Sequence, residues 1–442
     1  MVNAVGAFGA LFVAVFICLT GNGLLNTLLS TRMAVEGFST AATGIVLSCY
    51  FTGLLSGSFL CHHLIQRVGH IRAFTIFVAV TTAAALLHGL YLSPLFWGAL
   101  RFLCGIATFG MFMVIESWLN ECTESRNRGT VFSIYMTLSY LGIGIGQQLL
   151  NVGDVTGHEL FIIVGIIFAL GLVPVSATEG VHPRMPERKA FSFIAIFRKS
   201  PLGMLGSMAA GLTNSAFYAM TPVVCNGIGL TLRQLSWIMS ITVFSGLAAQ
   251  MVVGQLSDRL DRTVVLTVIA TTIAAVSGVI FISAAASFWP LAAAMGVIGA
   301  LVFAVYPLSV ARAHDIFGGQ DTIAVSAGLL FAYSIGASVS PVLASGMMTL
   351  LHTPFGLFAF WCLVNGAFAA IAVYLRKYEK METVPVADQV AFVPMKSTSP
   401  VVMAMDPRRE IQDTQTAYAS SGSRESALQH DPSTRLTTTS CS

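Results

Sequence analysis

The chain has 442 residues, of which 55% are hydrophobic and only 10% are charged. Soluble domains carry about 25% charged residues, so this composition indicates a membrane protein. The net charge is only +3, and the basic residues are dispersed, so no nucleic-acid partner is expected. The eight cysteines include no C-x-x-C pair, which argues against a zinc site, and we expect no metal site of another kind.

Apolar runs long enough to cross a bilayer follow one another along the whole chain. They predict twelve membrane-spanning helices, at about 5–29, 41–61, 73–92, 95–119, 130–151, 159–177, 201–224, 235–256, 263–284, 288–311, 322–350 and 354–375. We therefore predict an all-α membrane protein with two six-helix bundles, at 1–177 and 201–376. A polar cytoplasmic linker at 178–200 would join them. Residues 377–442 are rich in Ser, Thr and Pro, which is typical of a disordered tail.

The distribution of Lys and Arg predicts which side of the membrane each loop occupies. If both termini are cytoplasmic, most basic residues fall on the cytoplasmic side, and Arg312 is counted among these loop residues. The opposite side then carries only Arg32 and Arg233. Cytoplasmic loops carry the excess of basic residues in membrane proteins. The tail at 377–442 is therefore expected to be cytoplasmic.

A short charged loop with the pattern G-x-L-x-D-R-x-x-R runs from Gly254 to Arg262, between two predicted spans. Glycine permits two helices to approach closely, and an acidic side chain interacts favourably with the N-terminus of a neighbouring helix. The stretch 62–72 holds the same place in the first half as 254–264 holds in the second. This first copy keeps Arg67 and Gly69 but lacks the Gly and Asp of the pattern. An internal repeat of this kind is common in transporters, although a loop that only sets topology remains an alternative.

These features resemble the major facilitator superfamily over roughly residues 5–376. The strings LNTLLSTRMA, SCYFTGLLSG, VIESWLNECTESRNRG and FAVYPLSVA are similar to its YcaD-type bacterial branch. The resemblance implies twelve helices in two pseudo-symmetric six-helix bundles, in a bacterial inner membrane. The family's E-x6-R-G relay is matched by Glu121 and Arg128. The resemblance assigns a gate on the cytoplasmic face to Gly254, Asp258, Arg259, Arg262, Glu121, Arg128, Arg67 and Gly69.

Two charged residues, Arg101 and Glu116, lie well inside the fourth predicted span. An ionisable group at this depth is costly and marks function by default. The run LRFLCGIATFG around Arg101 resembles the family's helix-4 motif, whose Arg faces the central cavity and is tied to proton coupling. Alternatively, Arg101 snorkels outward and only anchors the helix. Glu116 either carries the coupled proton or joins Glu121 in a structural latch, and both interpretations stay open.

Polar residues at helical spacing interrupt several otherwise apolar spans. They either line a substrate cavity or hydrogen-bond one helix to another. The family places helices 1, 5, 7 and 11 around its cavity, which favours substrate contact for the set. The predicted cavity residues are Asn22, Asn26, Tyr140, Gln147, Asn214, Tyr218, Tyr306 and Tyr333.

The combined features predict a secondary transporter that moves a small organic solute by alternating access. We expect the proton gradient to drive it, with no other cofactor. The resemblance favours export. No G-x-x-x-x-G-K-[ST] loop and no catalytic cluster occur, so neither an ATP-driven pump nor an enzyme is expected. A monomer in the lipid bilayer is the expected state. The alternatives are a flippase for a lipid-like amphipathic molecule and a non-transporting membrane sensor that signals through its tail.

Overall fold

The computed structural model describes residues 2–123, 127–177, 192–284, 286–318, 322–378, 389 and 392. Within these residues it contains α-helices and one 3-10 turn, and no strand. The first half holds α1 (Val2–Val35), α2 (Thr40–Val68), α3 (His70–Leu90), α4 (Pro94–Cys122), α5 (Arg128–Gln148), η2 (Leu149–Asn151) and α6 (Glu159–Ser176). The second half holds α7 (Phe193–Lys199), α8 (Pro201–Gly227), α9 (Leu232–Ser257), α10 (Arg262–Ser283), α11 (Phe288–Phe317), α12 (Thr322–Leu350) and α13 (Gly356–Tyr378).

The predicted all-α membrane fold is confirmed. In the described part of the chain, ten helices are long and apolar enough to cross a membrane. The other two long helices, α5 and α8, fall below this level because both are rich in hydroxyl, amide and glycine residues. Both pack against helices of the other half, α5 on α9 and α8 on α1. Polar groups that face protein cost less than those that face lipid.

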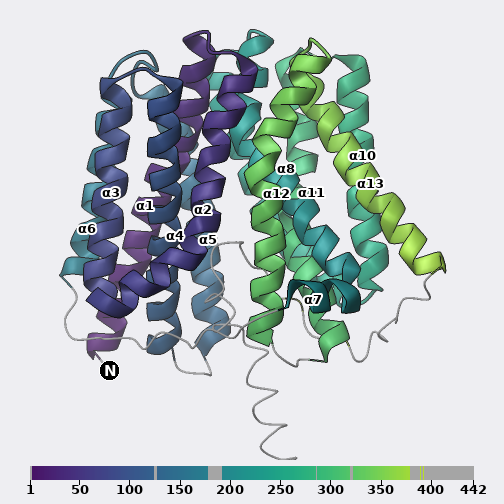
Figure 1. The fold of residues 1–442 in the computed structure, drawn as a ribbon, viewed down its shortest axis with the longest axis horizontal. Helices are drawn as coiled ribbons and strands as arrows, with labels where there is room; N and C mark the ends of the chain where they lie inside the picture. The colour runs from purple at the N-terminus through teal and green to yellow at the C-terminus, as the bar shows by residue number, and fades with distance from the viewer. Residues whose placement is uncertain are drawn as a thin grey trace, which may run out of the picture.

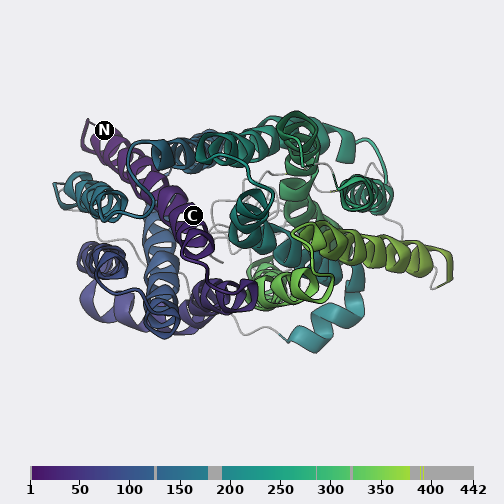
Figure 2. The same ribbon diagram turned by 90° about the horizontal axis from the view of Figure 1, so that it is seen from above.

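The long helices form two bundles that repeat the same packing. In the first bundle, α1 packs on α5, α2 on α4 and α3 on α6. In the second bundle, α8 packs on α12, α9 on α11 and α10 on α13. Across the interface, α2 meets α12 and α9 meets α5, which is the same contact with the bundles exchanged. The bundles lie side by side in Figures 1 and 2 and are related by a pseudo-two-fold axis.

Glycines allow these paired helices to approach until their backbones touch. Between α2 and α4, a Cβ added at Gly105 would lie 2.1 Å from the Tyr50 carbonyl oxygen. At the matching place between α9 and α11, a Cβ added at Gly299 would lie 2.2 Å from the Thr242 carbonyl oxygen. Neither contact leaves room for a side chain. The repeat in helix pairing is therefore also a repeat in glycine placement.

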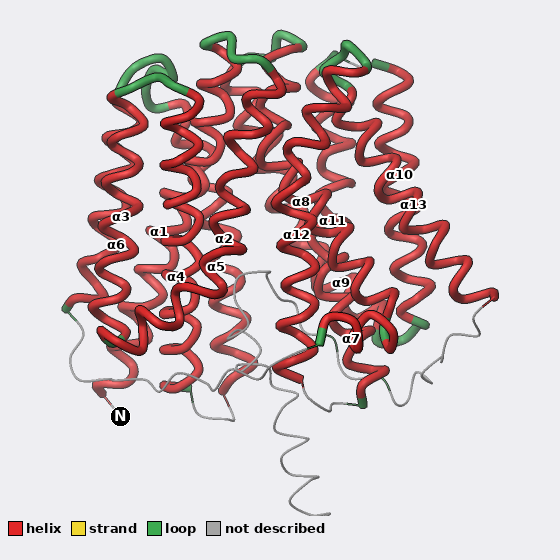
Figure 3. The backbone as a smooth tube through the Cα atoms, in the orientation of Figure 1, coloured by secondary structure: helices red, strands yellow, loops and turns green. Residues whose placement is uncertain are grey.

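The bundles are joined by hydrogen bonds near one end of the molecule. We call the side where α2, α9 and α13 end the terminal face, at the bottom of Figures 1 and 3, and the opposite side the far face. Close to the far face, Ser30 donates to the Ala219 carbonyl at 2.5 Å. Gln148 donates to the Ser240 hydroxyl at 2.7 Å. The ribbons of the two bundles diverge toward the terminal face (Figure 1).

Several helices extend beyond the predicted spans, since α1 ends at Val35 and α2 at Val68 where the predictions ended at 29 and 61. The tenth span was expected to end at 311, but α11 continues to Phe317, so Arg312 is a buried helix residue and not a loop residue. The extension is stabilised by an ion pair that Asp315 makes with α10. The helix α7 lies inside the predicted linker, where Ser192 caps it by accepting from the Ala195 amide at 3.3 Å. Residues 178–191 of this linker, and most of the predicted tail, fall outside the described residues.

Substitution at the α2–α4 glycine contact tests this packing. Gly105→Ala forces two backbones apart, so we expect it to destabilise the protein by about 1–3 kcal/mol, the usual cost of overpacking. Gly98→Ala on the same helix is the matched control, because its Cβ would meet only the Cys49 sulfur at 3.5 Å. Thermal unfolding in detergent measures both. Equal stability of the two variants would show that α2 and α4 do not touch at Gly105.

Candidate functional site

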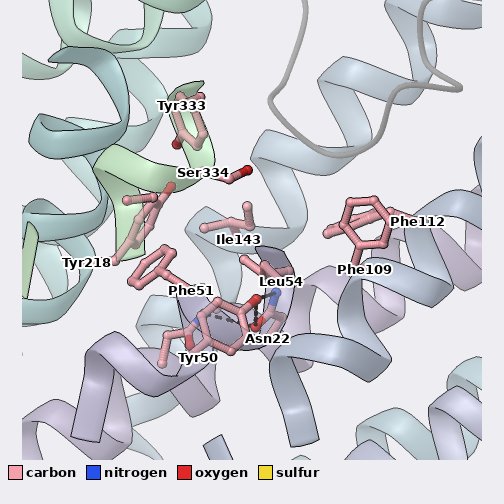
Figure 4. Close-up of a pocket in the computed structure, with 13 residues that line it drawn as sticks. Asn22, Tyr50, Phe51, Leu54, Phe109, Phe112, Ile143, Tyr218, Tyr333 and Ser334 are labelled. Carbon is pink, nitrogen blue, oxygen red and sulfur yellow. Dashed lines mark hydrogen bonds between the residues drawn. The ribbon is translucent and has the colours of Figure 1, made fainter. Parts of the chain in front are cut away.

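A cavity of about 110 Å³ lies between the two bundles. Figure 4 shows its lining side chains, which come from three of the first four helices, from α5 and from two helices of the second bundle. The lining residues are Asn22, Gly23, Asn26, Tyr50, Phe51, Leu54, Phe109, Phe112, Ile143, Tyr218, Tyr333, Ser334 and Ala337. Since both bundles contribute walls, any relative movement of the bundles changes the cavity.

A chain of polar contacts forms one end of this cavity. The Asn26 side-chain amide donates to the side-chain oxygen Oδ1 of Asn22 at 2.8 Å. Asn22 in turn donates to the Tyr50 hydroxyl at 3.3 Å. Asn22 and Asn26 are one turn apart on α1 and so share a face. Tyr50 approaches these two asparagines from α2, and the sequence analysis did not single out this residue.

Arg101 stands directly behind this polar end. Its Nη2 donates to the side-chain oxygen Oδ1 of Asn26 at 2.6 Å. Its guanidinium carbon lies 4.1 Å from the centre of the Tyr50 ring. The side chain is only 2% exposed, so it does not snorkel outward. Within the described residues Arg101 forms no ion pair, and its Nε and Nη1 have no hydrogen-bond partner. Among the residues that the structure describes, the guanidinium is thus a buried cation without a counter-charge.

The predicted cavity residues separate into two groups. Four of them line the cavity, namely Asn22, Asn26, Tyr218 and Tyr333. The other four, Tyr140, Gln147, Asn214 and Tyr306, do not line it and instead connect helices.

Each of these connecting residues contacts a polar or aromatic partner on another helix. The Tyr140 hydroxyl accepts from Gln250 of α9 at 2.8 Å, which links the two bundles. Gln147 accepts from Thr27 of α1. The Asn214 amide donates to the Tyr333 hydroxyl at 3.5 Å.

Glu116 is fully buried in the terminal half of α4. The Tyr135 hydroxyl of α5 donates to its carboxylate at 2.7 Å. The carboxylate also lies within electrostatic range of Tyr306 in the second bundle. The Tyr306 ring packs edge-on against the cavity residue Tyr333, with centroids 5.2 Å apart. Tyrosines therefore connect the surroundings of Glu116 with the cavity.

The charged loop at the terminal face of the second bundle is closely tied to its own bundle. Arg262 forms an ion pair with Asp315 of α11 at 2.6 Å, and neither side chain is exposed. A second pair joins Arg262 to Asp258 at 2.9 Å. Asp261 caps α10 by accepting from the Thr263 amide at 2.8 Å. Gly254 sits under the Phe392 ring, where a Cβ would lie 2.3 Å from Cδ1.

The other predicted gate residues take more open positions. Arg67, Arg259 and Glu121 are exposed. Gly69 ends α2 with a φ of +83°, and its amide donates to the Ile65 carbonyl at 2.9 Å. This left-handed backbone favours glycine. Arg128 begins α5, but its side chain falls outside the described residues. Among the described residues, no ion pair joins Arg67 or Glu121 to the second-half gate residues.

Four contact residues escaped the sequence analysis, namely Tyr50, Tyr135, Asp315 and Phe392. Tyr50 and Tyr135 sit in apolar spans like several other tyrosines. Asp315 lies beyond the predicted end of the tenth span at 311. Its distance along the chain from the 254–262 loop, read against the internal repeat, was a usable signal. The described residues contain no group of three or more His, Cys, Asp or Glu that could hold a metal ion.

Comparison with known proteins identifies the family. The sequence profile of the Major Facilitator Superfamily matches residues 11–232 and 203–409. An MFS-type transporter of Escherichia fergusonii, YcaD, is 29% identical over 327 residues, covering 74% of this chain and 84% of the relative. The YcaD protein of Shigella flexneri is also 29% identical, with the same coverage of both chains.

Solved transporter structures share the fold. The nucleoside transporter NupG superposes with a TM-score of 0.69 at 14% identity, over 86% of this chain and all of that chain. A bacterial homologue of the lysosomal transporter Spinster, in an inward-facing and unoccupied conformation, gives 0.60 at 13% identity, over 92% of this chain and 98% of that chain. With two pseudo-symmetric bundles enclosing a cavity and a family profile covering most of its length, the chain belongs to the major facilitator superfamily and is a transporter of the YcaD type.

Proposed function

We propose that the protein is a proton-coupled secondary transporter that exports a small organic solute by alternating access. Family membership and the transporter neighbours support secondary transport of a solute. Proton coupling is supported chiefly by the fully buried Glu116, which is bonded to a tyrosine. In this proposal the protein works as a monomer in the bacterial inner membrane, with both termini in the cytoplasm. No cofactor other than the proton gradient takes part.

Glu116 is assigned the role of proton carrier. A carboxyl group can bind and release a proton, and that of Glu116 is fully buried. Proton relays in membrane transporters use acidic residues at such depth. The Tyr135 hydroxyl contacts the carboxylate within the first bundle, and Tyr306 of the second bundle lies within electrostatic range of it. Protonation of the carboxylate can therefore favour one arrangement of the bundles over the other.

Arg101 is assigned to the same coupling system. The two residues lie fifteen positions apart on α4, about 22 Å along a straight helix, so they act on each other only through the field and the cavity. We therefore assign Arg101 the role of an electrostatic tuner of the coupling that acts over this distance and not by contact.

The 254–262 loop is assigned the role of gate at the terminal face. Gly254, Asp258, Arg259 and Arg262 occupy the end of α9 and the start of α10. Because α9 packs on α5 across the interface, this loop lies where the second bundle would meet the first on closure. Arg67, Gly69, Glu121 and Arg128 would form the opposing side of the gate.

Neutralising Glu116 tests proton coupling. We expect Glu116→Gln to abolish pH-gradient-driven accumulation in proteoliposomes, because the amide cannot carry the proton. Exchange of the same solute across the membrane should continue. The measurement is uptake from a library of labelled organic solutes, with and without an imposed gradient. Glu159→Gln is the matched control, because it makes the same change at an exposed position outside the cavity and the gate, and it should behave like the native chain.

Two results would count against this assignment. Gradient-driven uptake that is intact in Glu116→Gln would make Glu116 a structural latch. Absence of transport by the native chain for every solute would favour the flippase or the sensor over the transporter.

The buried ion pair of the gate makes a separate prediction about stability. Asp315→Asn leaves the Arg262 charge buried with one partner fewer, so we expect a loss of about 3 kcal/mol. Asp258→Asn breaks the partly exposed pair with the same arginine, and should cost less than about 1 kcal/mol. Thermal unfolding in detergent compares the two variants. Equal losses would mean that burial does not distinguish the two pairs.

A further inference from the structure

The environment of Arg101 contains information about the charge of the substrate. Its guanidinium is buried, and two of its nitrogens, Nε and Nη1, lack partners among the described residues. Its contacts are the neutral Asn26 amide and the face of the Tyr50 ring. A buried guanidinium is stabilised most by an anion that accepts two hydrogen bonds side by side. Within the described residues the protein supplies no such anion to Arg101.

The rest of the first-bundle wall is mostly apolar, while Tyr218, Tyr333 and Ser334 line the cavity from the second bundle. Phe51, Leu54, Phe109, Phe112 and Ile143 form apolar walls around the polar end described above, as Figure 4 shows. A ligand that fits this surface needs an apolar body of about the size of an aromatic ring and one polar head. The head would meet Asn26 and Tyr50, the two cavity residues that Arg101 touches.

We propose that the cavity binds an amphipathic organic anion, a monocarboxylate with an apolar or aromatic body, and that Arg101 is its counter-cation. The inference rests on the proposed transport function and specifies its substrate class. Arg101 does not itself line the cavity, so the carboxylate reaches its Nε and Nη1 by entering between Asn26 and Tyr50, whose side chains move aside. Cationic solutes are repelled by the same charge, and neutral solutes leave it uncompensated.

Matched acids and amides test this proposal by binding alone. The probes are benzoate, phenylacetate and indole-3-acetate, each paired with its neutral amide, which has nearly the same shape. Calorimetry and thermal unfolding of the purified full chain in detergent report binding. We expect the acids to bind the native chain at least about tenfold more tightly than their amides, a ratio that corresponds to 1.4 kcal/mol.

Variants at Arg101 connect the binding to this residue. Arg101→Gln should abolish the preference for acids, and Arg101→Lys should retain it in weaker form, because lysine keeps the charge without the planar pair of donors. A native-like unfolding transition of Arg101→Gln shows that the variant is folded. Arg101→Lys supplies the comparison if it is not.

The outcomes are distinct from those of the transport assay. Equal binding of acids and amides, acid binding that persists in Arg101→Gln, or no binding of any acid to the native chain would each overturn the proposal. Arg101-dependent binding of an acid that no gradient moves would leave the inference standing and would contradict the proposed transport function.

An independent observation concerns the end of the chain. The amide of Phe392 donates to the Asp258 carboxylate at 2.9 Å, and the side chain of Gln389 donates to the Leu260 carbonyl at 3.4 Å. The Phe392 ring covers Gly254, whose missing side chain makes room for it. Two positions of the C-terminal segment therefore contact the loop between α9 and α10.

These contacts use the groups assigned to the gate. Asp258 shares the same carboxylate oxygen between Arg262 and Phe392. Phe392 covers the glycine surface that would otherwise be free to meet another helix. We infer that the α9–α10 loop is a docking surface for the chain's own C-terminal segment, anchored by Phe392. Its docking opposes closure of the terminal face.

Hydrogen exchange of the full chain tests the docking from both sides. Phe392→Ala removes the ring, and Gly254→Ala places a methyl group where the ring lies. Each should raise deuterium uptake in peptides covering 254–262, and the double variant should raise it no further, since both changes break one contact. Unchanged uptake in Phe392→Ala, or additive increases in the double variant, would overturn this inference.

Discussion

A charge buried in the apolar interior of a membrane protein needs neighbours that replace water, and this constraint determines the arrangement around the cavity. Arg101 and Glu116 lie on one helix, and described polar side chains of neighbouring helices contact both of them. An asparagine and a tyrosine ring contact the cation, and a tyrosine hydroxyl contacts the acid. The described partners of Arg101 are neutral, so they solvate the cation without cancelling its charge. Arg101 therefore remains able to respond to an ionised ligand.

The gate follows a different rule. At the terminal face of the second bundle, Arg262 is paired with two carboxylates, one buried and one partly exposed. Opposite charges in contact fix structure, because separating them leaves an uncompensated ion. Behind the cavity wall, Arg101 is a cation whose described partners are neutral, whereas the gate holds charges that lock the ends of α9, α10 and α11 together. This division lets the bundle move as a rigid unit while its cavity wall stays responsive.

Much of the fold could be predicted because helix length and apolarity are local properties, and the repeat at 62–72 and 254–264 indicated two related halves. The i, i+4 spacing of Asn22 and Asn26 identified one wall of the cavity. Tyr140 and Gln147 share a polar character with them, yet they connect helices, since sequence periodicity gives a face and not its neighbour. Asp315 was missed because hydropathy ended its span too early. The contact of Phe392 with Gly254 joins positions far apart in the chain, which no local pattern reports.

The central claim is that the two bundles rock about their shared interface, so that the faces open in turn. Spin labels at Gln66→Cys and Leu260→Cys report the terminal face, and labels at Val152→Cys and Trp289→Cys report the far face, with native cysteines replaced by serine. Electron paramagnetic resonance distances in lipid vesicles are then compared before and after acidification. The account predicts that one distance shortens as the other lengthens, and that Glu116→Gln removes this response. If the label-to-label distances at both faces stayed unchanged on acidification, the account would be contradicted.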